Sequence, residues 1–84
     1  MLTIKILGAG CPNCKRLEAE TYAALNAAHP DIAYELIKVT DYADIVAYGV
    51  MSTPALVINE QVLSAGRIPK RDQIVTWARE AESV

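Results

Sequence analysis

The two cysteines of this 84-residue chain, Cys11 and Cys14, stand at C-x-x-C spacing between a strand pattern and a helix pattern. Residues 2–7 alternate between two faces, as a strand does, and Pro12 suits the first turn of a helix. A disulfide over so short a loop adds about 2 kcal/mol of stability, against about 4.7 kcal/mol for a 100-residue loop. The spacing therefore favours redox chemistry or metal binding over a structural staple.

The remaining pattern predicts seven elements in the order βαβαββα. Pro30 ends the first helix, Gly49 the second, and Asn59-Glu60 forms a turn between the last two strands. The expected strands span residues 2–7, 32–39, 55–58 and 61–65. The expected helices start at Pro12, at a cap on Thr40 or Asp41 with an end near Tyr48, and at Pro69.

These elements predict one α/β domain over residues 1–84, with a four-stranded mixed sheet flanked by three helices. The first two strands are expected to be parallel with a right-handed crossover, and the last two to form a hairpin. Two apolar stripes are expected to face the core. They comprise Cys14, Leu17, Thr21, Ala24, Leu25 and Ala28 in the first helix, and Ile74, Trp77, Ala78 and Ala81 in the last.

Composition narrows the class of function. A net charge of −2 and a pI near 5.2 argue against nucleic-acid binding. The apolar runs are far shorter than the roughly 20 residues that span a bilayer, and the N-terminus does not have the pattern of a secretory signal. We expect a cytoplasmic protein without a membrane partner, acting as a monomer.

The two sulfurs are expected to have different roles. Cys11 precedes Pro12 and so lies at a helix N-terminus, where unpaired N–H groups and the helix dipole stabilise a thiolate. Lys15 and Arg16 add positive potential one turn further on. Cys14 shares the apolar stripe with Leu17 and is expected to be less exposed. Cys11 is therefore the candidate nucleophile, and Cys14 the thiol that resolves the mixed disulfide.

Three segments together resemble the thioredoxin fold, in which a strand and a glycine precede C-x-x-C and a later strand starts with Thr-Pro. They are Gly10-Cys11-Pro12-Asn13-Cys14-Lys15, Ser52-Thr53-Pro54-Ala55-Leu56 and Gly66-Arg67-Ile68-Pro69. In length and element order the whole chain is most similar to the small microbial thioredoxin-like proteins of the redox-active disulfide protein 2 family.

The resemblance implies a thiol–disulfide oxidoreductase that reduces protein disulfides and takes electrons from a reductase. It implies no cofactor beyond the redox-active Cys11–Cys14 disulfide, and no metal. It also implies a cis peptide bond between Thr53 and Pro54, facing the cysteines and binding substrate. Gly10, Pro12, Asn13 and Lys15 have supporting positions in the motif, while Val50-Met51 and Ile68 are candidates for an apolar docking patch.

The sequence departs from better-known relatives in two respects. Thioredoxins have a buried acid on the strand before the motif and Trp before the first cysteine, whereas residues 2–7 contain no acid and Gly10 replaces the Trp. Cys-Pro-Asn-Cys is closer to the glutaredoxin motif. However, the segment that binds glutathione in glutaredoxins reads Ser64-Ala65-Gly66-Arg67 here, which does not predict glutathione dependence.

A small metal-carrying module for copper or zinc is the alternative reading of the same C-x-x-C. Metal-carrying domains of the heavy-metal-associated type place the motif after their first strand, but usually with Met before it, and their order is βαββαβ. Tetrahedral zinc needs two more ligands, and the one histidine, His29, belongs to the far end of the first helix. Redox chemistry is therefore favoured.

Overall fold

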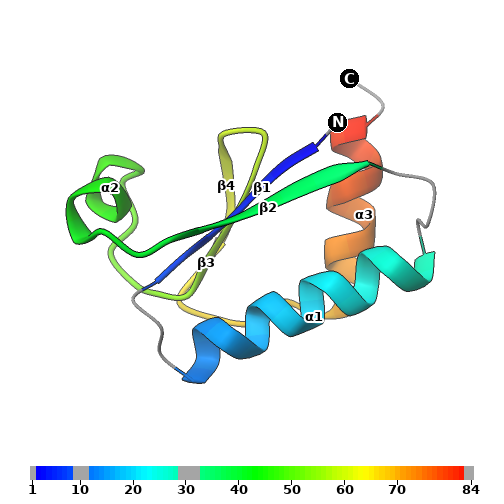
Figure 1. Cartoon of the computed structure of the whole chain (residues 1–84), viewed down its shortest axis with the longest axis horizontal. Coiled ribbons are helices and arrows are strands. Elements are labelled where there is room, and N and C mark those ends of the chain that lie inside the picture. The colour runs from blue at the N-terminus through cyan, green and yellow to red at the C-terminus, as the bar shows by residue number, and fades with distance from the viewer. Residues whose placement is uncertain (1, 9–11, 29–32, 83–84) are drawn as a thin grey trace.

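The computed structural model describes residues 2–8, 12–28 and 33–82, which contain all seven expected elements (Figure 1). The strands are β1 (Leu2–Leu7), β2 (Tyr34–Val39), β3 (Ala55–Ile58) and β4 (Gln61–Ala65). The helices are α1 (Pro12–Ala28), α2 (Tyr42–Ala47) and α3 (Arg71–Glu82). The order βαβαββα is confirmed.

The four strands form one mixed sheet in the order β2-β1-β3-β4. β1 and β2 are parallel, β1 and β3 are antiparallel, and β3 and β4 form the expected hairpin. In the β1–β3 register, Leu7 pairs with Ala55. The end of the first strand therefore lies beside the start of the third, although some fifty residues separate them in the sequence.

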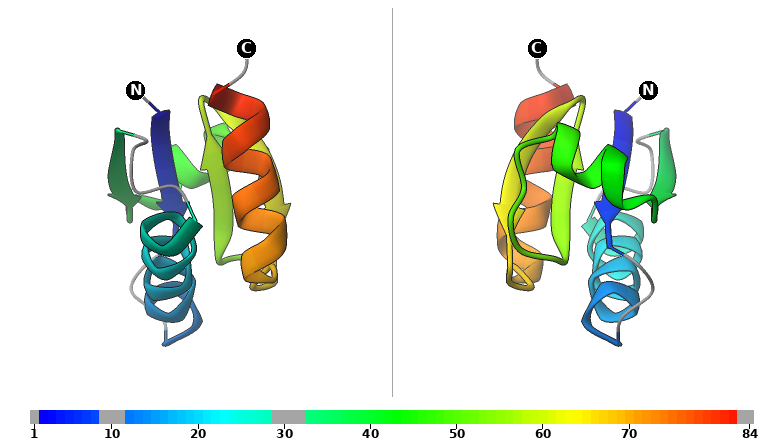
Figure 2. Two further views of the ribbon diagram at one scale, coloured as in Figure 1. Left: turned by 90° about the vertical axis from the view of Figure 1, so that its right-hand side faces the viewer. Right: turned by 90° about the vertical axis from the view of Figure 1, so that its left-hand side faces the viewer.

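Helices cover the two faces of the sheet unequally. α1 and α3 lie side by side on one face, and the short α2 lies against the other (Figure 2). This arrangement follows from β1, which points Leu2, Ile4 and Ile6 to the first face and Leu7 to the second.

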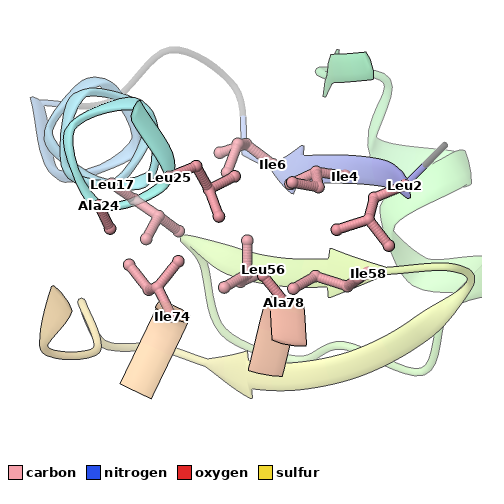
Figure 3. Packing of buried hydrophobic residues seen from close by; sticks show 10 residues of the cluster. All are labelled: Leu2, Ile4, Ile6, Leu17, Ala24, Leu25, Leu56, Ile58, Ile74 and Ala78. Atoms are coloured by element: carbon pink, nitrogen blue, oxygen red, sulfur yellow. The ribbon is translucent and has the colours of Figure 1, made fainter. Parts of the chain in front are cut away.

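The larger core fills the space between the sheet and the helices α1 and α3 (Figure 3). It includes Leu17, Ala24 and Leu25 of the first predicted stripe and Ile74 and Ala78 of the last, with Trp77 and Ala81 partly buried at its margin. Cys14 and Thr21 are also buried, and the side chain of Ala28 lies outside the described part of the chain. Its buried members are Leu2, Ile4, Ile6, Leu17, Ala24, Leu25, Leu56, Ile58, Ile74 and Ala78. A smaller cluster of Leu7, Ile45, Val50, Ala55 and Val57 lies under α2. β3 is buried on both faces, as its apolar run predicts.

Two predicted boundaries are wrong by two residues. β2 begins at Tyr34 rather than at 32, because Tyr34 pairs with Leu2, the first residue of β1; residue 32 lies outside the described residues. α3 begins at Arg71 rather than at Pro69. The Lys70 carbonyl accepts the first helical hydrogen bonds, from Gln73 and Ile74, and the Gln73 side chain accepts from the Lys70 N–H. Lys70 is therefore the N-cap.

The predicted turn at Asn59-Glu60 forms without glycine. Both residues have positive φ, 50° and 67°, which a two-residue hairpin turn of type I′ requires. Asn59 also joins the turn to β1, because its Oδ1 accepts from the Thr3 N–H and its own N–H donates to the Thr3 carbonyl. The α2 cap is Asp41, whose side chain accepts from the Ala43 N–H.

The packing predicts a large difference between two truncations. Leu56→Ala removes a fully buried side chain from the larger core and should lower the free energy of unfolding by about 2–5 kcal/mol. Met51→Ala, at a side chain that is 98% exposed, should change it by less than about 0.5 kcal/mol. Urea titrations of both variants measure these changes, and similar losses would contradict the assigned core.

Candidate functional site

Three segments meet at the edge of the sheet where β1 ends: Gly8, the first turn of α1, and the loop before β3. The Gly8 N–H donates to the Val39 carbonyl at 2.9 Å and so continues the line of β1. A methyl group placed on Gly8 would overlap Cys14 Sγ and would lie 3.7 Å from Thr53 Cβ. Gly8 therefore lies between Cys14 and Thr53, two of the residues that the sequence singled out.

Cys14 lies in the first turn of α1, on the core side. It is 5% exposed and disulfide-bonded, and it continues the stripe that includes Leu17. Pro12 is the first helical residue, as predicted, and Pro12, Asn13 and Lys15 are exposed beside it. Cys11 and Gly10 lie outside the described residues, so the nucleophilic role of Cys11 and the supporting role of Gly10 stay predictions.

The peptide bond between Thr53 and Pro54 is cis, as the resemblance implies. Thr53 is exposed and Pro54 is buried. The loop is held from the end of β4, because the Gly66 N–H donates to the Pro54 carbonyl at 2.9 Å. Gly66 has a φ of 76°, and a side chain there would approach Ser52 Cβ to 2.9 Å. A glycine is therefore favoured at position 66, because it adopts a positive φ without strain and has no side chain to collide with Ser52.

An apolar groove of about 530 Å³ runs from Thr53 along α2. Met51 lies on it and is almost fully exposed, whereas Val50 belongs to the smaller core. Ile68 packs against the larger core. Of the predicted docking patch, Val50 and Met51 line this groove and Ile68 does not, while residues of α2 extend it. The groove is lined by Tyr42, Ile45, Val46, Gly49, Val50, Met51 and Thr53.

The α2 part of this groove was missed in the sequence. Tyr42 and Val46 are both exposed apolar residues of a short helix. Their spacing of four residues places them on one face, and this is the signal that indicates an apolar surface outside the core.

Cys14 also lines a smaller cavity, of about 100 Å³. Ile6 and Gly8 of the β1 segment, Cys14, Lys15 and Glu18 of the α1 segment, and Lys38 and Thr40 of the β2 segment line it. Glu18 and Lys38 form an ion pair across it, with 3.5 Å between Nζ and Oε2. The sequence pattern assigns Glu18 to the solvated side of the helix. The overlooked signal is that it follows Cys14 by four residues, one turn of the helix.

A second charged group lies on the opposite face of the sheet, away from Cys14. Lys5 Nζ donates to the Tyr48 hydroxyl at 2.7 Å and lies 2.6 Å from Glu60 Oε1. Two hydrogen bonds, the larger contribution from Lys5 and the smaller from Tyr48, hold the pKa of the Glu60 carboxyl below its usual value. These partners link β1, α2 and the hairpin turn, so we interpret the group as structural.

Within residues 2–8, 12–28 and 33–82, no group of three or more His, Cys, Asp or Glu side chains is placed to hold a metal ion. In the same part of the chain, no helix has the length and apolar character needed to cross a membrane.

Comparison with known proteins places the chain among relatives of similar size. Residues 2–79 match a family described as a thioredoxin domain. The chain is 31% identical over 74 residues to a thioredoxin of Methanothermobacter thermautotrophicus, covering 88% of this chain and 94% of that protein. It is 32% identical over 76 residues to a thioredoxin of Methanocaldococcus jannaschii, covering 88% and 83% respectively.

The narrower assignment to the redox-active disulfide protein 2 family stays a prediction. Assignment to the thioredoxin family does not depend on that narrower assignment. The match to the thioredoxin domain spans nearly the whole chain and agrees with the mixed sheet and its three helices. The chain therefore belongs to the thioredoxin family, as a small thioredoxin-like protein with a thiol–disulfide oxidoreductase kind of role.

Proposed function

We propose that this protein reduces disulfides of partner proteins through its Cys-Pro-Asn-Cys motif. The observation that carries the proposal is the placement of Cys14: buried, disulfide-bonded, in the first turn of α1 and next to Gly8 and Thr53. A disulfide-bonded cysteine beside an exposed loop and an apolar groove suits an exchange reaction with another chain.

The reaction proceeds in two exchanges. The Cys11 thiolate attacks a sulfur of the partner's disulfide, which forms a mixed disulfide and releases one partner cysteine as a thiolate. The Cys14 thiolate then attacks the Cys11 sulfur, which forms the Cys11–Cys14 bond and releases the second partner cysteine. Two electrons pass to the partner, and an electron-donating reductase returns two to the protein. No cofactor takes part.

The helix start favours Cys11 as the attacking group. Pro12 opens α1, and the N–H groups of the first turn lack partners within the helix, so a thiolate at the preceding position is proposed to be stabilised by them. Lys15 adds a positive charge in the first turn. Gly10, directly before the motif, and Asn13, within it, are proposed to have supporting roles.

Thr53 and Pro54 are proposed to position the substrate. Thr53 is exposed at the end of the groove nearest Cys14, and its backbone offers hydrogen bonds to an extended segment of the partner. The groove with the exposed Met51 suits an apolar side chain near the partner's cysteine. A protein substrate is proposed to use this surface.

The oligomeric state, compartment and partners that we propose follow from the same features. One chain supplies both cysteines, the loop and the groove, so a monomer suffices. The cytoplasm, where thiols are kept reduced, suits a C-x-x-C pair that works by cycling rather than as a staple. We propose neither nucleic acid nor a membrane as a partner, in agreement with the charge and hydropathy of the sequence.

Trapping of a mixed disulfide tests the roles proposed for Cys11 and Cys14. A Cys14→Ser variant should accumulate a mixed disulfide with a partner protein through Cys11, because the resolving thiol is missing. Cys11→Ser should trap far less, because its remaining thiol is buried. Non-reducing electrophoresis and mass spectrometry measure the adducts. The roles are wrong if Cys11→Ser traps partners equally well. The activity itself is contradicted if the native protein reduces no protein disulfide with dithiothreitol as the electron source.

Gly8→Ala tests the close approach of β1 to the sulfur. The added methyl overlaps Cys14 Sγ, so we expect a loss of about 1–3 kcal/mol in unfolding free energy and a slower disulfide reduction. Ile74→Ala is the control, because it removes a buried side chain of α3 outside the site and should lower stability without slowing reduction. Gly8→Ala with undiminished stability and turnover would contradict the geometry.

A further inference from the structure

The proposed second exchange requires the buried Cys14 to lose a proton. Burial disfavours a thiolate, because it removes the charged form from water. In thioredoxins, a buried acid on the strand before the motif is thought to help remove this proton. The corresponding strand here, β1, contains no acid. The three residues at its end and just beyond it, Ile6, Leu7 and Gly8, cannot accept a proton through a side chain.

Glu18 places a carboxylate near Cys14 from the helix itself. It follows Cys14 by one turn of α1, and both residues line the 100 Å³ cavity. The Glu18 side chain is only 22% exposed, unlike that of its partner Lys38 at 63%. The cavity has room for at least one water, which needs roughly 10–15 Å³, so a proton can cross it directly or through water.

Three charged groups face this cavity among the described residues: Lys15 and Glu18 from α1, and Lys38 from β2. From the β1 segment, only Ile6 and the following Gly8 line it. Lys38 pairs with Glu18 at 3.5 Å, which holds the carboxylate over the cavity and balances its charge when a thiolate forms nearby. Glu18 is therefore the carboxylate positioned to take the proton.

We propose that Glu18, held by Lys38, accepts the thiol proton of Cys14 during the second exchange; this rests on the proposed function. As the Cys14 S–H bond breaks, the proton passes to the Glu18 carboxylate, and the sulfur forms its bond to Cys11. The bond between Cys11 and the partner breaks, and its electron pair leaves on the partner's thiolate. Glu18 then releases the proton to solvent or to that thiolate.

A two-phase reaction separates the two exchanges. The fully reduced protein, mixed with a limiting amount of 5,5′-dithiobis(2-nitrobenzoate), releases one coloured thiolate when Cys11 attacks and a second when Cys14 resolves the mixed disulfide. The first phase depends on reagent concentration and the second does not. In Glu18→Gln the second phase should slow at least about tenfold at neutral pH, the first phase should be unchanged, and the difference should vanish at alkaline pH.

One variant acts as a control and another tests the role of Lys38. Glu20→Gln neutralises another carboxylate of the same helix, one paired with Arg71, and should change neither phase. Lys38→Met keeps the acceptor but leaves its charge unbalanced, so the second phase should need a higher pH to reach half of its maximum rate. Thermal unfolding of each variant shows whether the fold is retained.

The outcomes separate the inference from the function on which it rests. Glu18→Gln with an unchanged second phase overturns the inference while the native protein still shows both phases. An equal slowing in Glu20→Gln also overturns it, because the effect then belongs to the helix and not to the cavity. Native protein that never releases the second thiolate contradicts the proposed function itself.

Discussion

The site depends on one close approach, that of the end of β1 to the first turn of α1. Gly8 has no side chain, and the space that a methyl would occupy there is filled by Cys14 Sγ. The sulfur can therefore be buried beside the sheet while the helix that carries it starts at the surface with Pro12. A larger residue at position 8 moves either the strand or the helix, and both hold the larger core.

The sheet order brings the other half of the site to the same place. Because β1 and β3 are antiparallel neighbours with Leu7 opposite Ala55, the chain leaving β1 passes the chain entering β3. Thr53 and Cys14, which are far apart in the sequence, thus lie on either side of Gly8. On one face of the sheet, α1 carries Cys14 and packs beside α3, and on the opposite face α2 borders the groove.

Local patterns predicted the elements because most of them are determined locally. Pro12 opens α1, Asp41 caps α2, and the alternation of residues 2–7 fixes which side chains enter the core. The β2 boundary failed because it depends on a distant partner, since β2 starts where β1 does. The α3 boundary failed although its cap is local, because the Gln73 side chain accepts from the N–H of Lys70 and makes Lys70 the N-cap. Thr-Pro indicated the loop, but its distance from Cys14 follows from the β1–β3 register.

The missed parts of the site lie on the solvent side of helices. Glu18 has the pattern of a surface residue, and only the position of β2 turns its exposed face into the wall of a cavity with Lys38. Likewise, Tyr42 and Val46 have the spacing of a helix face, but the loop at Met51 and Thr53 is needed to make that face one side of a groove. Tertiary neighbours decide both, so a linear pattern cannot place them.

The central claim is that the C-x-x-C pair exchanges electrons rather than carries metal, and intact mass measured under non-denaturing conditions tests it most directly. The account predicts a metal-free chain that loses two hydrogen atoms on mild oxidation and regains them with dithiothreitol. A Cys11→Ser variant should not show this change in mass within a single chain. Stoichiometric copper(I) or zinc, held against a chelator by the native protein and lost in that variant, would contradict it.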